Sequence, residues 1–345
     1  MKRLILILFI LLLICGGIAA WIFMGPATGF DQKSKALYIS SHAATKKAVM
    51  DSLKKNRIIT NDNAFEFLAN RMDYWQKIKP GKYEFKKGSS LLDIVRTLRN
   101  GKQTTVDLVI TKLRTKEDLA KMIGRKFETD SAEMISFLNN DDSLSRFQTQ
   151  AELSMVNIIP DKYSYFWNST PSQIYEKLYK ESKQFWTEER KQKAAALGLK
   201  PEEVYILASI IEEETTNHNE KDTIASVYLN RLRIGQVLQA DPTLKFATRQ
   251  FELKRIAGDI LNTESPYNTY KNKGLPPGPI CTPSRITIDK VLNPANTNYF
   301  YFVANRNLNG HLFSTSFEEH VKKANQYREE DRQRREADSI KNARK

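Results

Sequence analysis

The longest uncharged stretch of the chain stands at its N-terminus. After Lys2 and Arg3, residues 4–24 contain no charged side chain, and these 21 positions are enough for a helix to cross a bilayer. A chain that begins in this way is expected to be held at a membrane by one helix. The sequence therefore predicts a single-pass membrane protein in which residues 1–3 form a short tail ahead of an anchor at 4–24.

A cleaved signal peptide is the alternative for this stretch. Its strongest apolar core, residues 4–14, has the length of a signal sequence, and Ala19 and Ala20 are small enough for a cleavage site. Apolar side chains continue through residues 21–24, so we favour an uncleaved anchor. A short N-terminal tail stays in the cytoplasm, while a long domain behind it is exported largely regardless of charge. We therefore expect a protein of the inner (cell) membrane with residues after the anchor outside the cytoplasm.

The formal net charge of +14 indicates an anionic partner, such as nucleic acid, a membrane surface or an acidic cell-wall polymer. The sequence has no basic region interleaved with aromatic residues and no zinc-knuckle spacing, so we expect no nucleic-acid partner. Cys15 lies in the apolar run and Cys281 far downstream, which predicts no disulfide between them.

Three consecutive glutamates follow a helical apolar stripe in the middle of the chain. Leu207, Ile210 and Ile211 have the i, i+3, i+4 spacing of a helix with one buried face. At about 100° per residue, Glu214 lies within about 60° of this stripe, whereas Glu212 points to nearly the opposite side. Burial against apolar side chains would raise the pKa of the Glu214 carboxyl and suit it to donate a proton near neutral pH. A solvated helix end is the alternative interpretation.

The sequence around these glutamates resembles that of a known family. The segments ASIIEEET, ASVYLNRLRIG, LQADPT, YNTY at 267–270 and GLPPGPICTP at 274–283 follow one another in the order typical of the endolytic murein transglycosylase (YceG-like) family. The resemblance is dense from 204 to 320 and extends in outline over 36–325. It implies cleavage of the β-1,4 bond between N-acetylmuramic acid and N-acetylglucosamine in nascent peptidoglycan strands, without water, leaving 1,6-anhydro ends.

The resemblance also implies which residues carry the reaction. Glu214 would be the catalytic residue, acting first as acid and then as base. The residues that would bind the substrate, by motif match, are Asn230, Gln239, Asp241, Tyr267, Asn268, Thr269 and Tyr270. Asp241 precedes a proline, and capping a turn is its alternative role. The family commonly has Lys where this chain has Glu213, and like-charge repulsion from Glu213 is expected to raise the pKa of Glu214 further.

The chain as a whole predicts an α+β protein with several parts. A linker at 25–35 is expected to lead into a small LysM-like unit at 36–112, where the stretch KPGKYEFKKGSSLLDIV carries the resemblance. This unit would bind glycan or serve only as a spacer. A lysozyme-like catalytic domain of the YceG type would follow at 113–325, and a charged tail at 326–345.

Several local patterns predict elements within these parts. Ser89 or Ser90 would cap a helix that stops at Gly101, and KYEF at 82–85 would form a hairpin piece. Strands are expected at 299–304 and 311–316, joined by a turn at 305–310. The aromatic residues of IIPDKYSYF are expected either to border the glycan cleft, as the resemblance implies, or to lie in the core; they are Tyr163, Tyr165 and Phe166.

Other chemistries are poorly supported. The four histidines show no HExxH spacing, and the sequence has no GxSxG elbow, phosphate-binding loop or dinucleotide fingerprint, so we expect no metal and no cofactor. His311 and His320 match family positions, and structural roles are expected for both. A retaining glycosidase needs two carboxyls about 5 to 5.5 Å apart. A lytic transglycosylase avoids this need because the C6 hydroxyl of its substrate is the nucleophile.

The expected partners are peptidoglycan glycan strands and the cell membrane, with peptidoglycan synthases as further candidates. Two other functions remain open from the sequence. One is a membrane-anchored wall-binding protein without turnover, and the other is a glycan hydrolase that uses Glu214 together with Asp241.

Overall fold

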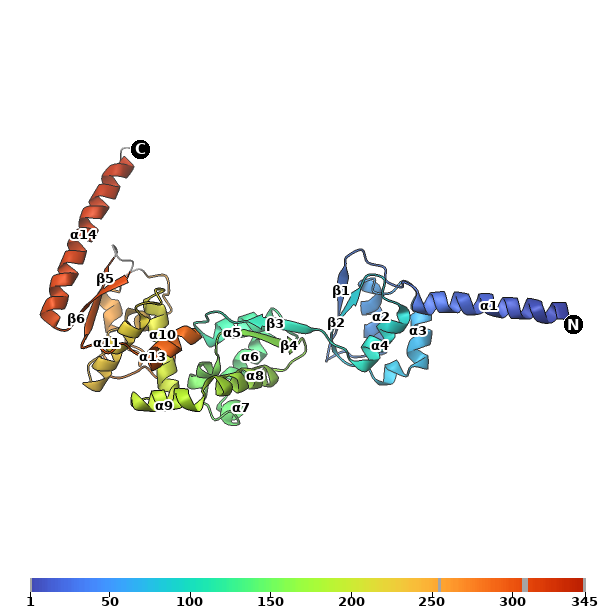
Figure 1. The fold of residues 1–345 in the computed structure, drawn as a ribbon, viewed down its shortest axis with the longest axis horizontal. Coiled ribbons are helices and arrows are strands. Elements are labelled where there is room, and N and C mark those ends of the chain that lie inside the picture. The colour runs from blue at the N-terminus through green and yellow to red at the C-terminus, as the bar shows by residue number, and fades with distance from the viewer. Residues whose placement is uncertain (1, 254–255, 306–309, 344–345) are drawn as a thin grey trace. The chain divides into compact units, whose positions relative to one another are not determined.

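The computed structural model describes residues 2–253, 256–305 and 310–343, and it shows a mixed α+β chain with two compact units (Figure 1). The N-terminal unit comprises Met1–Leu108, Met122–Ser131 and Tyr163–Pro171. The C-terminal unit comprises Val109–Lys121, Ala132–Lys162 and Ser172–Lys345. Each unit has its own hydrophobic core, so each is described by itself below.

The apolar run at the N-terminus forms one helix, α1 (Lys2–Met24), of 23 residues. None of its residues is buried, and its leucine and isoleucine side chains are exposed around the helix. Among the described residues, it is the one helix that is long and apolar enough to cross a membrane by length and composition. A helix that is apolar on all sides and packs inside no protein core has the character of a lipid-facing segment.

The rest of the N-terminal unit packs helices against a two-stranded antiparallel sheet. Strand β1 (Ser34–Ile39) pairs with β2 (Gly81–Lys86), with Ala36 opposite Glu84. KYEF was expected in a hairpin, but its partner strand lies about 45 residues earlier, across two helices. The other elements of the unit are α2 (Lys46–Lys55), α3 (Asp62–Arg71), the 3₁₀ turn η1 (Tyr74–Gln76) and α4 (Leu91–Asn100).

Helix α4 confirms the prediction of a helix that is capped by a serine at its start and stops at Gly101. The Ser90 hydroxyl accepts a hydrogen bond from the Asp93 backbone N–H at 3.1 Å, and Gly101 ends the helix with a φ of 69°, in the left-handed region that glycine adopts readily. The apolar face is buried as its spacing predicts, and it consists of Leu91, Ile94, Val95 and Leu98. Local capping chemistry and periodicity are sufficient to define this element.

Residues 25–35, expected to be a linker, are instead packed on the N-terminal unit. Ala27 and Phe30 are each 4% exposed and belong to its core. The Ala27 N–H donates to the Ser89 carbonyl at 3.1 Å, and the Gly29 N–H donates to the Arg57 carbonyl at 3.0 Å. The few apolar residues in a Gly- and Pro-containing segment therefore serve as core residues rather than as parts of a spacer.

The boundary between the units also differs from the expected division at residue 112. Segments 122–131 and 163–171, expected in the catalytic domain, pack with the N-terminal unit. Strands β3 (Thr105–Val109) and β4 (Lys162–Phe166), which fall mainly in this unit, form a second two-stranded sheet. Such pairing between distant segments is not visible in local patterns. The likeness of the unit to a LysM module stays a prediction.

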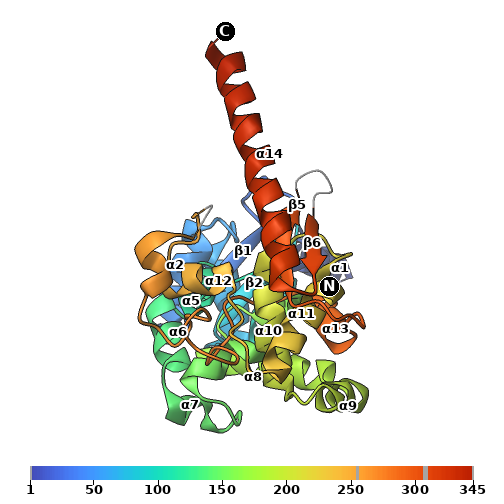
Figure 2. The ribbon, with the colours of Figure 1, turned by 90° about the vertical axis from the view of Figure 1, so that its left-hand side faces the viewer.

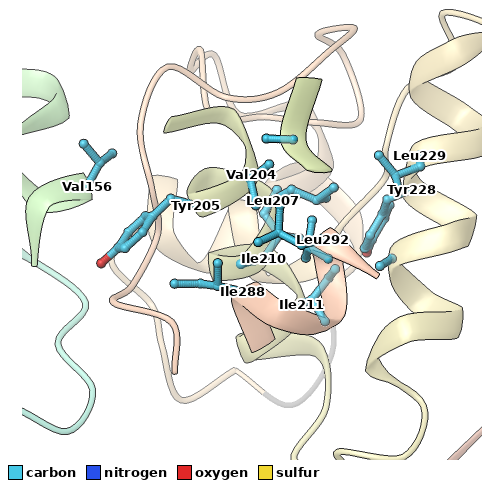
Figure 3. Packing of buried hydrophobic residues seen from close by; sticks show 14 of the residues in the cluster. Val156, Val204, Tyr205, Leu207, Ile210, Ile211, Tyr228, Leu229, Ile288 and Leu292 are labelled. Atoms are coloured by element: carbon cyan, nitrogen blue, oxygen red, sulfur yellow. The ribbon is translucent and has the colours of Figure 1, made fainter. Parts of the chain in front are cut away.

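The C-terminal unit is built around α10 (Pro201–Glu214), the helix that carries the three glutamates. Residues 204–211 of α10 are all buried, and the helix packs against α9, α11, α12 and α13. Figure 3 shows Leu207, Ile210 and Ile211 among apolar side chains of α11 and α13, which include Tyr228 and Leu292. A helix that is buried all round holds its C-terminal end in a fixed position, and that end is where the glutamates stand.

The remaining elements from residue 116 onward are mostly helical. They are α5 (Lys116–Gly124), α6 (Ser131–Leu138), α7 (Asp141–Ser145), η2 (Ala151–Asn157), α8 (Pro171–Phe185), α9 (Glu188–Ala196), α11 (Lys221–Arg233), α12 (Asp241–Ala247), η3 (Gly258–Asn262) and α13 (Arg285–Leu292).

A β-hairpin and a long helix complete the C-terminal unit. Strands β5 (Tyr301–Asn305) and β6 (Gly310–Ser314) pair antiparallel, with Ala304 opposite His311. The turn predicted at 305–310 lies largely outside the described residues. Helix α14 (Phe317–Ala343) packs against both strands near its start and extends beyond them (Figure 2). The hairpin also contacts α11, which brings it close to the end of α10.

Candidate active site

The three glutamates at the end of α10 lie in three different environments. Glu212 accepts a hydrogen bond from the Lys221 ammonium at 2.9 Å, and Lys221 is only 1% exposed. Ser284 and Thr287 also donate their hydroxyls to Glu212. Burial alone would raise the pKa of Glu212, but these hydrogen bonds and the Lys221 charge lower it below its ordinary value. Glu212 is therefore an ionised structural carboxylate.

Glu213 is also paired. The Arg114 guanidinium donates to it from two nitrogens, Nε to Oε1 and Nη2 to Oε2, each at 3.1 Å. The Lys112 ammonium lies 3.1 Å from the same carboxylate. Burial would raise the pKa of Glu213, but hydrogen bonds from Arg114 and Lys112 lower it overall. A two-pronged arginine pair of this geometry fixes the carboxylate in place.

Glu214 alone has no cationic partner at ion-pair distance among the described residues. The Tyr228 hydroxyl donates to its Oε1 at 2.6 Å. Burial raises the pKa of Glu214 to about 7, with a further rise from the charge of Asp241 and a partial reduction from the Tyr228 hydrogen bond. A carboxyl with this pKa is protonated in a large fraction of molecules at neutral pH and can donate its proton.

The like charge acting on Glu214 differs from the expected one. We expected repulsion from Glu213, but that carboxylate is neutralised by Arg114 and Lys112 and points to another side of the helix end. Asp241, at the start of α12, is the carboxylate that raises the pKa of Glu214. Side chains at consecutive helical positions point in directions about 100° apart, so the carboxyls of Glu213 and Glu214 are farther from each other than their adjacency in sequence suggests.

Glu214 borders two cavities. The first, of about 370 Å³, is called the aromatic cavity here; its wall includes Arg231, Gln239, Asp241, Tyr270, Tyr301, Phe302, Phe317 and His320. The second, of about 480 Å³, is called the polar cavity; its wall includes Lys112, Glu213, Thr215, Thr216, Glu220 and Tyr327. Glu214, Ala304 and His311 line both cavities, so the carboxyl stands at the junction between them.

Three of the seven predicted substrate-binding residues line the aromatic cavity with Glu214. Asp241 begins α12, and its Oδ1 accepts a hydrogen bond from the Tyr270 hydroxyl. Gln239 adopts a left-handed backbone with a φ of 52°, and its N–H donates to the Thr269 carbonyl at 2.9 Å. These contacts connect the 238–241 segment to the YNTY segment and hold Gln239, Asp241 and Tyr270 at one wall.

Asn230, expected in the cleft, does not line either cavity. Its Nδ2 donates to the backbone carbonyls of Thr297 and Tyr299, at 2.9 and 3.0 Å. Its Oδ1 accepts a hydrogen bond from Arg233. The amide thus ties α11 to the chain that enters β5, which satisfies buried backbone groups rather than facing a ligand.

The other three residues of YNTY also have internal partners. Asn268 is fully buried and donates to the carbonyls of Leu261 and Thr263, at 3.0 and 2.8 Å. Thr269 is 1% exposed and hydrogen-bonds the Ala240 N–H. Tyr267 packs its ring on Phe246, with ring centres 4.8 Å apart, outside both cavities. The amide and one phenol expected to bind sugar therefore build the loop that carries Tyr270.

The aromatic residues of IIPDKYSYF lie in the N-terminal unit rather than on the cavity walls. Tyr163 and Tyr165 are 3% and 5% exposed, and the ring of Tyr165 meets that of Phe127 edge to face. Phe166 is half exposed and lines neither cavity. Two of the three thus have the core role that was the alternative expectation.

Sequence reasoning missed several residues at the site. Tyr228 and Arg231 stand three positions apart on α11, so both face Glu214 from one side of that helix. Their spacing within ASVYLNRL was the available signal. Tyr301 and Phe317 line the aromatic cavity from β5 and α14, and no local pattern predicts that these distant elements meet.

The two histidines differ. The His311 backbone N–H and ring Nδ1 both contact the Glu220 carboxylate, at 2.9 and 3.0 Å, which agrees with the structural role expected for it. His320 stacks on Tyr301, with ring centres 5.3 Å apart. Burial lowers the pKa of His320, and the Arg231 charge lowers it further, so the ring is neutral at pH 7. Among the described residues, no group of three or more His, Cys, Asp or Glu side chains is arranged to hold a metal ion.

Comparison with known proteins defines the class to which this fold and site belong. The model of the YceG-like family matches residues 37–326, and the chain belongs to that family. A crystal structure of a YceG-like protein from Listeria monocytogenes is similar, with a TM-score of 0.56 and 25% identity, covering 85% of this chain and 99% of that one.

Two curated relatives carry the same descriptive name. The chain is 26% identical over 295 residues to the endolytic murein transglycosylase of Bacillus subtilis (strain 168), covering 81% of each protein. It is 24% identical over 287 residues to the endolytic murein transglycosylase of Streptococcus pneumoniae serotype 2 (strain D39), covering 73% of this chain. The match spans about half (51%) of that longer relative.

Proposed function

We propose that this protein is a membrane-anchored endolytic peptidoglycan transglycosylase that uses Glu214 as its single acid and base. The observation that carries the proposal is the contrast at the end of α10. Two of three adjacent carboxylates are neutralised by cations, while the third has a pKa raised to about 7 and faces a cavity. The names of the relatives support peptidoglycan as the substrate.

In this mechanism Glu214 first protonates the oxygen of the bond between N-acetylmuramic acid and N-acetylglucosamine. The bond breaks, positive charge develops at C1 of the muramyl ring, and Glu214 becomes a carboxylate. The hydrogen bond from Tyr228 stabilises that carboxylate. Burial keeps Tyr228 protonated, since it raises the pKa of the phenol well above its ordinary value.

The second half of the reaction regenerates the acid. Glu214 takes the proton of the C6 hydroxyl on the same muramyl ring, and the C6 oxygen bonds to C1. The product is a 1,6-anhydro sugar, and the atoms balance without water. Because nucleophile and electrophile belong to one sugar, the effective concentration of the hydroxyl is high.

The walls of the two cavities suit a glycan strand. Tyr301 and Phe317 contribute aromatic side chains for apolar contact with sugars, and Gln239 brings an amide for hydroxyl or acetamide groups. An enzyme that cuts within a strand needs room for sugars on both sides of the acid. The position of Glu214 between the aromatic and polar cavities supports such internal cleavage.

A hydrolase that uses Glu214 with Asp241 is the second candidate. The observation in its favour is that Asp241 lines the same cavity and its charge acts on Glu214. In that reaction Asp241 would activate a water, and the new ends would be reducing sugars. The hydrogen bond from the Tyr270 hydroxyl holds the Asp241 carboxyl in place, and from there it would stabilise positive charge near C1 without attacking it.

The proposal includes the arrangement of the chain at the membrane. Helix α1 would anchor the protein in the inner membrane with its N-terminus in the cytoplasm and the catalytic site outside. The N-terminal unit would include a LysM-like part that positions glycan, the C-terminal unit would be the catalytic part, and residues 326–345 would be a charged tail. Peptidoglycan synthases would be its neighbours, since they make the nascent strands.

The test is product analysis of purified wall treated with the full-length protein in detergent. Mass spectrometry of the released glycans should show 1,6-anhydro-N-acetylmuramic acid at the new ends. Reducing ends would favour the hydrolase with Asp241. Binding to wall with no new ends of either kind would favour an anchored wall-binding protein.

A further inference from the structure

Arg231 is a buried charge without a counter-ion. Its side chain lies in the wall of the aromatic cavity, and the residue is 6% exposed. Among the described residues, no carboxylate lies within ion-pair distance of its guanidinium. Buried arginines are normally paired, because removing an ionised group from water costs several kcal/mol. Burial lowers the pKa of Arg231, in agreement with this cost.

The guanidinium is held in one orientation by backbone carbonyls. Its Nε donates to the Phe300 carbonyl and its Nη1 to the Leu238 carbonyl, both at 2.6 Å. The guanidinium carbon Cζ also lies over the Tyr301 ring, 5.2 Å from the ring centre. These contacts leave Nη2 as the nitrogen without a partner among the described residues. Because the guanidinium is planar and rigid, the direction of its Nη2 donors is fixed as well.

The carboxyls that share the cavity do not neutralise this charge. Glu214 is protonated in a large fraction of molecules near neutral pH, and its oxygen is hydrogen-bonded by Tyr228. Asp241 is hydrogen-bonded by Tyr270. A neutral side chain could donate hydrogen bonds to the two backbone carbonyls, so these contacts do not by themselves account for a buried positive charge. A charged, oriented and incompletely satisfied donor beside the acid is therefore suited to an acceptor that arrives with the substrate.

We propose that Arg231 is a substrate-binding residue that donates a hydrogen bond to an acyl oxygen on the muramyl sugar beside Glu214. This inference rests on the proposed function. Two acyl groups on that sugar have the required chemistry, namely the lactyl arm, as peptide amide or free carboxylate, and the 2-acetamido group. The lactyl arm is the acceptor that would distinguish the muramyl sugar from N-acetylglucosamine, which also carries an acetamide.

The test measures binding with full-length protein in detergent and a Glu214→Gln background, so that it needs no turnover. The probes are a muramyl tetrasaccharide with its peptide stems, the same glycan with the stems removed to leave lactyl carboxylates, and a chitin tetrasaccharide. Replacing Arg231 with Gln should weaken both muramyl probes by about tenfold to a hundredfold, the usual contribution of one hydrogen bond to a charged group. Binding of the chitin probe should change much less.

Asn230→Ala is the matched control. Asn230 is adjacent to Arg231 on α11 and also ties the helix to backbone carbonyls, but it lines neither cavity. A purely structural role of Arg231 predicts that both substitutions weaken all three probes alike, which would overturn the proposal. Arg231→Lys keeps the positive charge but replaces the planar guanidinium and its fixed N–H donors with an ammonium. Compared with Arg231→Gln, it should restore part of the affinity for the lactyl carboxylate probe.

Other outcomes are equally decisive. An equal loss for all three probes in Arg231→Gln, with Asn230→Ala unchanged, assigns the contact to the acetamide and removes the lactyl part of the proposal. Arg231→Gln could also leave all three affinities unchanged and, in protein that retains Glu214, shift only the pH dependence of cleavage. That result would mean that Arg231 acts on Glu214 and binds no substrate. If muramyl probes bind with the expected selectivity but the unaltered enzyme releases no product from wall, the proposed function fails while the assignment of Arg231 stands.

Discussion

At the scale of single residues, the site depends on how the pKa of one carboxyl is raised. Glu214 is shielded from water and receives one hydrogen bond from a phenol, whereas its two neighbours are bound by Lys221 and Arg114. The chemistry of the three side chains is identical, so the difference in their pKa comes entirely from their surroundings. This arrangement makes the role of each glutamate separable by substitution.

Replacing Glu214 with Gln should abolish cleavage and preserve the fold. Gln keeps the shape of the side chain but has no transferable proton. Since one group serves both halves of the reaction, the loss should exceed the roughly hundredfold to ten-thousandfold usually attributed to one acid–base step. The measurement is the rate of anhydro-end formation on purified wall. Glu213→Gln is the control and should have a milder effect; unchanged activity in Glu214→Gln would refute the central claim.

The pH dependence of cleavage should follow Glu214. The first step requires the protonated carboxyl, so activity should fall as pH rises through about 7, the value to which burial raises this pKa. Replacing Tyr228 with Phe removes a hydrogen bond that stabilises the carboxylate, so the pKa should rise and the alkaline fall should move up by about one unit. Initial rates between pH 5 and 9 test this. A fall that moves to lower pH would show that Tyr228 acts in the opposite sense.

At the scale of elements, the end of α10 is fixed by a buried ion pair to α11. Lys221 is 1% exposed and contacts both Glu212 and Thr287, which joins α10, α11 and α13 at one point. Breaking a buried pair by removing one partner leaves the other charge uncompensated. The pair therefore positions the end of α10 that carries Glu214 as well as supporting the core.

Lys221→Met should lower the free energy of unfolding by about 3 to 5 kcal/mol, because the largely enclosed Glu212 carboxylate then remains without its cation. Lys193→Met provides the comparison, since Lys193 pairs with Glu189 on the surface, where both side chains are well exposed. That change should cost less than about 1 kcal/mol. Urea unfolding followed by circular dichroism measures both. Equal effects of the two substitutions would contradict the structural role of the buried pair.

Elements with local signals could be predicted from the sequence, and those formed by distant pairing could not. Helix α4 follows from Ser90, Gly101 and its apolar spacing, and α10 from the stripe that ends in Glu214. The pairing of β1 with β2 and the packing of Phe30 depend on contacts across the chain. Glycine, proline and polar residues in 25–35 indicated a linker because composition does not show which few apolar side chains find a core.

The candidate site shows the same division. Glu214 could be placed by helical geometry and by resemblance, and Gln239, Asp241 and Tyr270 by resemblance. Asn268 was assigned to substrate because an amide suits sugar hydroxyls, but its donors satisfy backbone carbonyls of its own loop. Sequence shows which groups a residue carries, whereas only the fold shows whether those groups are already used.

At the scale of the whole molecule, we expect the exposed apolar helix α1 to hold the protein at a membrane. A reporter fused to the C-terminus should be active outside the cytoplasm, and the mature chain should retain residues 2–24, since α1 is long enough to span the bilayer. Reporter activity and N-terminal sequencing of the membrane fraction test both points. A cytoplasmic reporter signal, or a mature N-terminus near Ala20, would refute the anchor.

The position of Glu214 as the last residue of α10 has an electrostatic consequence of its own. The backbone dipoles of a helix add up to a partial negative charge at its C-terminal end, which disfavours a carboxylate there by about 0.3 to 1 kcal/mol. The same side chain at the first turn of a helix would be stabilised as an anion. The backbone of α10 therefore favours the protonated form of Glu214 before any side chain contributes. In the proposed mechanism it would oppose the ionised form of Glu214, and it would thereby assist the return of the proton from the substrate.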